Sequence, residues 1–214
     1  MFRPDFIGTQ HDNKKQMKKI TTPLSDDVLK TLKAGDEVLL SGTIYTARDA
    51  AHKRLSNHLL LTTDQLPLIL KGAVIYYTGP TPEKPGKIIG SCGPTSSYRM
   101  DRYTAILLKN GLKATIGKGP RSEEVKKAME KHKAVYFAAP GGTGALLSKC
   151  VKRSEIIAYP ELGCEAVRKL EVENFPLIVI NDIKGRDFYN STTYITDCNV
   201  GARVFPKGTS RKFA

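Results

Sequence analysis

The chain has 214 residues, 40% of them hydrophobic, which is enough for one compact domain with a loosely attached end. It contains no run of about eighteen uncharged apolar residues, and residues 1–20 lack the apolar core of a secretory signal, so the sequence predicts a cytoplasmic protein outside the membrane. Lysine and arginine total 34 against 21 aspartate and glutamate residues, and the net charge of +13 favours an anionic partner.

The two ends of the chain are predicted to lie outside the main domain. Residues 1–20 are polar, lack a hydrophobic period and include a run of lysines, which is typical of a basic arm. Residues 206–214 are expected to form a short basic tail. Residues 21–205 are then expected to form the folded domain.

At the start of this domain, the pattern predicts a helix, a strand and a second helix. Ser25 is a helix cap followed by two aspartates, and the short helix that it begins should end by Gly35. A strand follows at 37–47, which is rich in β-branched and aromatic residues, and the spacing becomes helical at 48–60.

The middle of the chain is predicted to contain short strands and a long loop. The apolar runs at 66–70 and 73–77 indicate strands, and the segment 79–86 is a crossing rich in proline and glycine. Small residues at 91–97 then lead into a helical pattern at 98–110. We therefore expect a loop that enters the N-terminus of a helix.

From residue 114 onward, the pattern alternates between strand and helix. Strands are predicted at 114–116, 134–139, 156–158 and 177–181, and helices at 122–132, 142–151 and 162–172. Such alternation is typical of crossover units on a largely parallel sheet. The sequence thus predicts an α/β fold in which a strand-rich layer packs against an α/β layer.

The four cysteines, at Cys92, Cys150, Cys164 and Cys198, lie far apart, with no C-x-x-C pair and no histidine cluster beside them. This spacing indicates no local zinc or ferredoxin-type site, and reduced thiols are the simplest interpretation. A cluster held jointly by the first three cysteines is the alternative, which requires that they converge in the fold.

The first candidate site surrounds the corner at which the strand 37–47 becomes a helix. Arg48 stands at the end of the strand, where its planar fork and the free backbone N–H groups of the new helix both favour a carboxylate. Asp49 can cap the helix and orient this arginine. His52 is either a titrating residue of the site or a structural histidine. A surface capping pair is the alternative interpretation of Arg48 and Asp49.

The second candidate site is the segment 93–101, which reads GPTSSYRMD. Small hydroxyl residues, Thr95 among them, precede a predicted helix whose backbone N–H groups can bind an anion. Arg99, inside the first turns of that helix, adds a permanent positive charge. An ordinary helix capped by serine or threonine is the alternative.

Two glycine-rich segments are further candidates. Lys118 lies between Gly117 and Gly119 after a predicted strand, so the backbone can approach a ligand and the ammonium group can reach it, although many such triplets are simple turns. The segment 141–144 resembles a phosphate-binding loop but lacks the spacing and the Lys-Ser/Thr ending of a P-loop. Close packing against a strand is the interpretation we favour for it.

Six segments of the sequence, in order, resemble the beta subunit of class I fumarate hydratases and L-tartrate dehydratases, which is also the C-terminal domain of single-chain members. The segments are GTIYTARDAAHKRL, GPTSSYRMD, GKG, GGTGALL, PELGCEAVRKLEVENFPLIVINDIKG and RDFY. Two departures stand out: Cys164 occupies a position where methionine is expected in many relatives, and GPTS replaces the GPTT form.

The resemblance implies a swivelling β/β/α domain, with a mixed or parallel sheet and flanking helices, in a hydro-lyase. It also implies an alpha subunit whose cysteines hold a [4Fe–4S] cluster with one open iron position, which acts as Lewis acid on the substrate hydroxyl. This chain would then hold no metal. An α2β2 heterotetramer is the implied assembly.

The resemblance assigns, by motif position, four residues that contact a dicarboxylate substrate: Arg48, Thr95, Arg99 and Lys118. Arg48 and Lys118 would bind carboxylates as part of the catalytic set, and Thr95 would lie near the carbon that gains or loses a proton. A threonine hydroxyl is a poor acid unless a charged neighbour is coupled to it, so its role as a proton shuttle is the weakest assignment. Asp49 and His52 would support these residues from behind.

The function implied is the reversible hydration of fumarate to malate, with the dehydration of L-tartrate to oxaloacetate as the alternative. These substrates differ by small groups that a pocket shared with another subunit must distinguish. A basic nucleic-acid-binding module is the alternative outside the enzymes, suggested by the charge of +13 alone. The absence of tryptophan and of an interleaved aromatic set argues against it.

Overall fold

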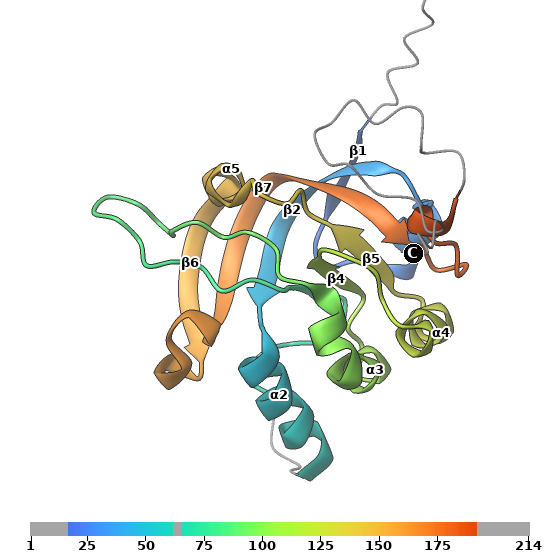
Figure 1. Cartoon of the computed structure of the whole chain (residues 1–214), viewed down its shortest axis with the longest axis horizontal. Helices are drawn as coiled ribbons and strands as arrows, with labels where there is room; N and C mark the ends of the chain where they lie inside the picture. Colours follow the sequence, from blue (N-terminus) through green and yellow to red (C-terminus); the bar gives the residue numbers. More distant parts are fainter. Residues whose placement is uncertain (1–16, 62–65, 192–214) are drawn as a thin grey trace, which may run out of the picture.

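The computed structural model describes residues 17–61 and 66–191, which are organised by a seven-stranded sheet in the order β1-β2-β3-β4-β5-β7-β6 (Figure 1). The strands are β1 (Lys18–Thr21), β2 (Glu37–Thr46), β3 (Val74–Tyr76), β4 (Ala114–Gly117), β5 (Val135–Ala138), β6 (Val151–Ala158) and β7 (Val167–Asn181). The first five run parallel, whereas β7 is antiparallel to β2, β5 and β6. Because β7 pairs with both β5 and β2, the strands from β2 to β5 and β7 close into a ring.

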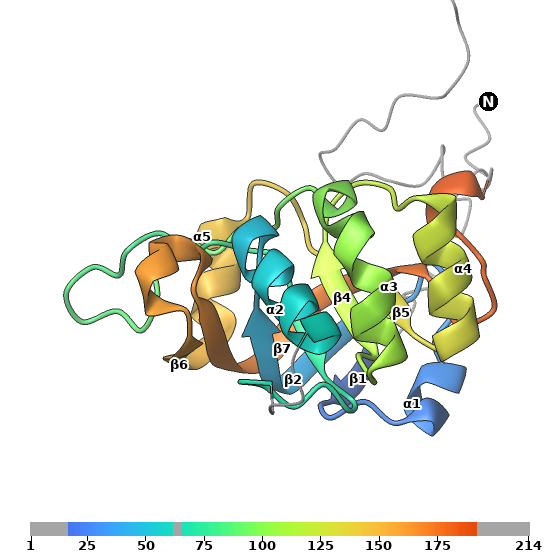
Figure 2. The same ribbon diagram turned by 90° about the horizontal axis from the view of Figure 1, so that it is seen from below.

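The three longest described helices cover one face of this sheet, and the two short ones pack with the apolar cluster on the other side. The described α-helices are α1 (Asp26–Lys30), α2 (Asp49–Leu61), α3 (Asp101–Lys109), α4 (Glu123–His132) and α5 (Gly144–Leu147). The described 3-10 turns are η1 (Ser97–Met100), η2 (Ser148–Cys150), η3 (Pro160–Glu165) and η4 (Phe188–Asn190). Figure 2 shows α2, α3 and α4 side by side, and α3 contacts both of its neighbours.

The sheet separates two apolar clusters, because successive residues of a strand point to opposite faces. Tyr76 and Phe137 lie in one cluster together with residues of β2 and β7. Tyr77 and Tyr136 lie in the other, together with apolar residues of α2, α3 and α4. All four aromatic side chains are fully buried. The packing of both faces confirms the predicted α/β class.

Most of the predicted elements are confirmed with shifts of one or two residues at their ends. They are the helices predicted at 48–60 and 122–132 and the strands predicted at 37–47, 114–116 and 134–139. The segment 98–110 begins as the 3-10 turn η1 and continues as α3. These segments have strong local periodicity or caps, such as the Ser122 side chain that accepts a hydrogen bond from the Val125 N–H.

The predicted helix at 162–172 is wrong. Its residues form part of η3 and the first six residues of β7, in which Val167, Leu170 and Val172 are buried. In this region β7 pairs with β2 on one edge and with β6 on the other. These two ladders satisfy the backbone groups of both edges and override the local spacing of apolar residues that suggested a helix.

The neighbouring predictions need smaller corrections. The segment 142–151 contains only the short helix α5 and the turn η2, and β6 begins five residues before the predicted strand at 156–158. Because β6 lies at the edge of the sheet with mostly exposed or half-buried residues, it lacks an apolar run. The segment 66–70 is not a strand, although Leu68 and Leu70 are buried.

Regular structure begins at Lys18, inside the segment 1–20 that the sequence predicts as an arm. Lys18–Thr21 forms β1, which runs parallel to β2, and Ile20 is buried. The Lys18 ammonium group lies 2.7 Å from a carboxylate oxygen of Asp36. Residues 1–16 and 192–214, which contain most of the predicted arm and the whole predicted tail, lie outside the described residues.

No helix in the described ranges is long and apolar enough to cross a membrane.

Candidate functional site

The candidate residues lie where three adjacent parallel strands end. Arg48 follows β2, and Lys118 follows β4. Between them, the Thr95 N–H donates to the carbonyl oxygen of Tyr77, one residue after β3, at 2.7 Å. The Lys118 N–H donates to the Thr95 carbonyl at 3.2 Å, and the Ser97 N–H donates to the Lys118 carbonyl at 2.9 Å. The fold therefore brings these segments together at the carboxyl edge of the sheet, a common position for ligand sites.

The Arg48 side chain is held beside Gly79. A Cβ atom at Gly79 would lie 2.8 Å from Nη1 of Arg48 and 3.1 Å from the Cys164 carbonyl oxygen, so a larger residue there would push the guanidinium group from its position. On its other side, Nη2 of Arg48 lies 3.5 Å from a carboxylate oxygen of Glu165. The Arg48 side chain remains about one-fifth exposed, so its fork is fixed but can be reached from solvent.

Asp49 pairs with Arg99 and not with Arg48 as the sequence predicted. Nε of Arg99 donates to Oδ1 of Asp49 at 3.0 Å. Nη2 of Arg99 lies 2.7 Å from Oδ2, a contact that is electrostatic and not a well-directed hydrogen bond. Adjacent residues at a strand-to-helix corner point in different directions, so being next to each other in the sequence does not make a pair. The ion pair instead ties α2 to η1.

Glu165 takes the role that the sequence gave to Asp49. One of its carboxylate oxygens accepts a hydrogen bond from the Ala50 N–H at 2.9 Å, and the other faces Arg48. A single carboxylate thus satisfies a free N–H in the first turn of α2 and contacts the arginine beside it. Sequence analysis missed Glu165, because it lies in the segment predicted to be a helix and far along the chain from Arg48.

His52 is a neutral, buried support for the same corner. Its Nδ1 lies 2.9 Å from the Arg48 carbonyl oxygen, which can only accept, so Nδ1 carries the proton. Burial lowers the pKa of His52 to about 4, and its ring packs edge-on against Tyr77. The structural interpretation of this histidine therefore holds, and it does not titrate near neutral pH.

Glycines shape the turn that carries Lys118. A Cβ atom at Gly117 would lie 2.0 Å from Oγ of Ser97 and 3.0 Å from the Tyr77 ring, so the close approach of η1 to β4 requires glycine there. Gly119 has a φ of +79°, a left-handed conformation that other residues rarely adopt. The Lys118 side chain between them is exposed, and Thr95 is half-buried.

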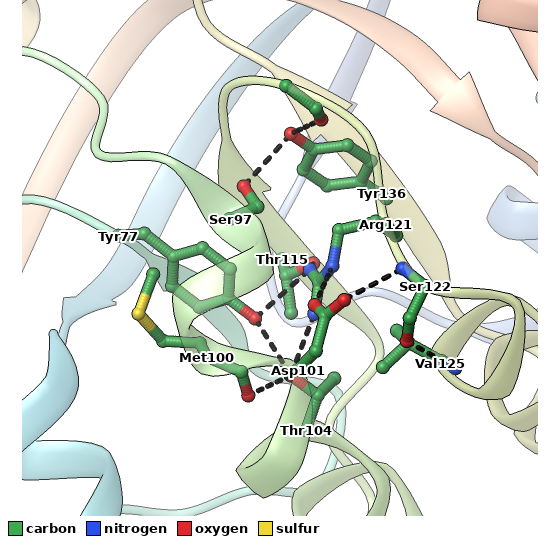
Figure 3. Close-up of polar contacts among 11 residues, drawn as sticks. Tyr77, Ser97, Met100, Asp101, Thr104, Thr115, Arg121, Ser122, Val125 and Tyr136 are labelled. Carbon is green, nitrogen blue, oxygen red and sulfur yellow. Dashed lines mark hydrogen bonds and ion pairs between the residues drawn. The ribbon is translucent and has the colours of Figure 1, made fainter.

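A buried arginine that sequence analysis did not single out underlies these segments (Figure 3). The side chain of Arg121 has no exposure, and its Nε donates to Oδ1 of Asp101 at 2.7 Å. Its other nitrogens donate to the hydroxyl groups of Tyr77, Thr104 and Thr115. Desolvation by itself lowers the pKa of Arg121, but the neighbouring Tyr77 and Asp101 outweigh it and the net change is upward.

The partners of Arg121 explain its burial. Oδ2 of Asp101 also accepts from the Ser122 N–H at 2.7 Å, so this carboxylate joins the starts of α3 and α4. A buried charge is tolerated only where it is paired and hydrogen-bonded, as it is here. The sequence contains no local signal for this arrangement, because Asp101 and Arg121 belong to different elements.

The segment 141–144 packs against the loop that leads to Thr95. A Cβ atom at Gly144 would lie 2.8 Å from the Gly93 nitrogen, and the Cys92 N–H donates to the Gly144 carbonyl at 3.2 Å. Close packing is the role that we favoured for this segment, although its neighbour is a loop and not a strand. It supports the second candidate site from the side.

The described residues do not fit a metal site. Among them, no group of three or more histidine, cysteine, aspartate or glutamate residues is placed to hold an ion. Cys92 is buried, and burial raises its pKa to about 12, whereas Cys164 is exposed. A thiolate ligand at Cys92 would therefore be costly. The alternative of a cluster shared by Cys92, Cys150 and Cys164 finds no support among the described residues, and Cys198 lies outside them.

Comparison with known proteins gives the family. The sequence model described as "Fumarase C-terminus" matches residues 2–192. The chain belongs to this family. It is 39% identical over 180 residues to the anaerobic class I fumarate hydratase of Escherichia coli, which covers 83% of this chain and 32% of that protein. It is 41% identical over 160 residues to fumarate hydratase 2 of Leishmania major, covering 74% of this chain and 28% of the relative.

In a third relative, the region that matches this chain makes up most of the protein. A protein of Methanocaldococcus jannaschii, provisionally named L(+)-tartrate dehydratase subunit beta, is 42% identical over 167 residues, covering 75% of this chain and 85% of that one. By contrast, the chain spans about a third of the fumarate hydratases that it matches. The family resemblance seen in the sequence is thus confirmed for the C-terminal part of those enzymes.

Proposed function

We propose that the chain is the beta-type subunit of a [4Fe–4S]-dependent hydro-lyase that hydrates fumarate reversibly to malate. The observation that carries this proposal is that Arg48 and Lys118 follow adjacent strands of one edge, that the Thr95 segment is hydrogen-bonded between them, and that Arg99 pairs with Asp49 beside Arg48. Glu165 and Asp49 hold the two arginines in place. An edge built in this way suits a small molecule with a carboxylate at each end.

In this proposal the residues of the chain bind and orient the substrate. The forks of Arg48 and Arg99 and the ammonium group of Lys118 bind the two carboxylates, which fixes the carbon atoms between them. The Thr95 hydroxyl lies next to the carbon that gains or loses a proton. A threonine hydroxyl is by itself a poor acid and a poor base, so in this proposal the stronger acid or base belongs to the partner.

The partner that we propose is an alpha subunit that carries the [4Fe–4S] cluster. The beta-subunit name of the M. jannaschii relative, and the much greater length of the fumarate hydratases, support a division of the enzyme between two chains. The cluster would supply the Lewis acid when bound.

We further propose the swivelling β/β/α arrangement for the domain, an α2β2 assembly and a cytoplasmic location. The closed ring of β2–β5 and β7, with the three longest described helices on one face, supports the first of these. The folded domain would extend to residue 205, with the segment 206–214 as a basic tail.

The test is reconstitution. The full chain is mixed under anaerobic conditions with its cluster-loaded alpha subunit, and turnover is measured with fumarate, malate, L-tartrate and mesaconate. We expect fumarate–malate turnover by the pair and none by either chain alone. Absence of turnover with every substrate would contradict the hydro-lyase proposal.

Dehydration of L-tartrate to oxaloacetate is the second candidate function. It is favoured by the relative from M. jannaschii, which matches this chain over most of its own length. The same substrate panel separates the two candidates, because a preference for L-tartrate over malate would select the second. The nucleic-acid-binding alternative gains no support from the family, and steeply salt-dependent binding to any duplex would be its signature.

A further inference from the structure

A single buried hydroxyl group joins the two segments of the candidate site. The Tyr136 hydroxyl lies 2.9 Å from Oγ of Ser97, the first residue of η1, which also carries Arg99. It also donates to the Gly119 carbonyl oxygen at 2.8 Å, next to Lys118. Figure 3 shows this hydroxyl between the two segments.

The direction of this chain of hydrogen bonds follows from its chemistry. The Gly119 carbonyl can only accept, so the phenol proton of Tyr136 points to Gly119. The Ser97 hydroxyl must then donate its own proton to the Tyr136 oxygen. Both bonds therefore run one way, from Ser97 through Tyr136 to Gly119, and such consecutive bonds strengthen one another.

The position of Tyr136 is itself fixed. Its ring lies on β5 in the core beneath the helices and is fully buried. The Arg121 guanidinium lies 5.2 Å from the ring centre, which is within range of a cation–π contact. Burial raises the pKa of Tyr136, so the phenol stays protonated at every working pH.

The backbone contacts between the two segments are few. Ser96 and Lys118 form an isolated bridge and not a continuous ladder. Lys118 is exposed and Thr95 and Ser96 are only half-buried, so water can compete for these bonds. The core shields the hydrogen bonds of the Tyr136 hydroxyl from water. Because residue 117 is glycine, η1 can approach β4 closely enough for Ser97 to contact that hydroxyl.

We propose that Tyr136 is a positioning residue that sets the separation between the segment of Thr95 and Arg99 and the turn of Lys118. It thereby sets the separation of the positive charges that hold a dicarboxylate, although it does not contact the substrate. The inference rests on the proposed function and adds to it a residue from a third strand. It also gives a role to Ser97, whose hydroxyl points into the protein and donates to Tyr136.

The experiment compares Tyr136→Phe with Tyr76→Phe in the reconstituted enzyme. Tyr76 is an equally buried tyrosine on β3, which β4 separates from β5, and its hydroxyl donates to the Cys92 carbonyl at 2.5 Å on the other face of the sheet. Each variant loses one hydroxyl with a backbone partner, so the loss of thermal stability should be similar. KM for the dicarboxylate should rise about tenfold in Tyr136→Phe and stay within about twofold of the wild type in Tyr76→Phe.

The kinetic constant that changes separates positioning from a purely structural role. Partial unfolding removes active enzyme, which lowers the apparent kcat but leaves KM unchanged. A rise in KM therefore reports altered substrate contacts. An unchanged KM in Tyr136→Phe, or an equal rise in Tyr76→Phe, would overturn the inference.

A double-mutant cycle with Ser97→Ala tests the proposed route. If Ser97 acts through Tyr136, the double variant should have nearly the same KM as either single variant. A KM equal to the product of the two separate increases would show independent effects and overturn the inference. Turnover of the wild-type enzyme is measured first. If there is none, the proposed function is contradicted and the inference falls with it. If the wild type turns over and Tyr136→Phe has the same kinetics, only the inference is contradicted.

Discussion

At the scale of single residues, carboxylates decide how the arginines of the candidate site are held. Glu165 faces Arg48, Asp49 faces Arg99, and Asp101 binds the buried Arg121. Each pair joins elements that are distant in the sequence. The first two arginines keep part of their surface exposed, whereas Arg121 has none, which separates groups that can bind a ligand from one that supports the fold.

The geometry of Arg48 leads to a prediction for its replacement by lysine. Arg48→Lys keeps the charge but loses the planar fork, so kcat/KM of the reconstituted enzyme should fall about a hundredfold. Arg54→Lys is the matched control, because Arg54 lies on α2 and pairs with Glu161 of η3 on the exposed surface. Steady-state kinetics with fumarate and malate measure both. Wild-type kinetics in Arg48→Lys would remove this residue from the site.

The lowered pKa of His52 leads to a prediction for stability against pH. Its folded value of about 4 lies below the model-peptide value of 6.5, so the unfolded chain binds the proton more readily. The contribution of His52 is present above pH 6.5 and is lost as the pH falls toward 4, by an amount on the order of 3 kcal/mol.

Denaturant unfolding at several values between pH 7 and pH 4 measures this change. His52→Gln does not titrate, so the free energy of unfolding of this variant should fall less over the same range. Equal slopes for the wild type and the variant would contradict the assignment of a neutral, buried His52.

At the scale of elements, close approaches at glycine set how η1 and β4 meet. Gly117→Ala would place a methyl group 2.0 Å from Oγ of Ser97, so this variant should be destabilised by about 1–3 kcal/mol. Gly141→Ala is the control, because a Cβ atom there meets nothing within 4 Å. Equilibrium unfolding of both variants checks the difference, and equal stability would show that η1 can move away from β4 at little cost.

The difference between local spacing and pairing with distant strands explains which predicted elements are right and which are wrong. The helices α2 and α4 follow their local spacing, and the Ser122 cap of α4 is visible in the sequence. The segment 162–172 was assigned wrongly because its conformation depends on β2, more than one hundred residues earlier, and on β6. Local spacing carries no information about such pairing.

At the scale of the whole molecule, the closed ring of strands places the ends of β2, β3 and β4 side by side. This arrangement turns three segments that are separate in the sequence into one basic edge. The chain covers about a third of the fumarate hydratases that it matches, so it corresponds to one part of those longer proteins. The long loop between β3 and η1 extends from the body beside this edge (Figure 1).

The sequence by itself determined the family, the α/β class and the identity of the basic residues, because these depend on motifs and local spacing that can be read along the chain. Only the tertiary structure decided that Asp49 pairs with Arg99, that Glu165 faces Arg48, and that Arg121 is buried beneath Tyr136. Each of these contacts joins residues at least fifteen positions apart along the chain. Their partners are set by strand order and close packing, which the local sequence does not encode.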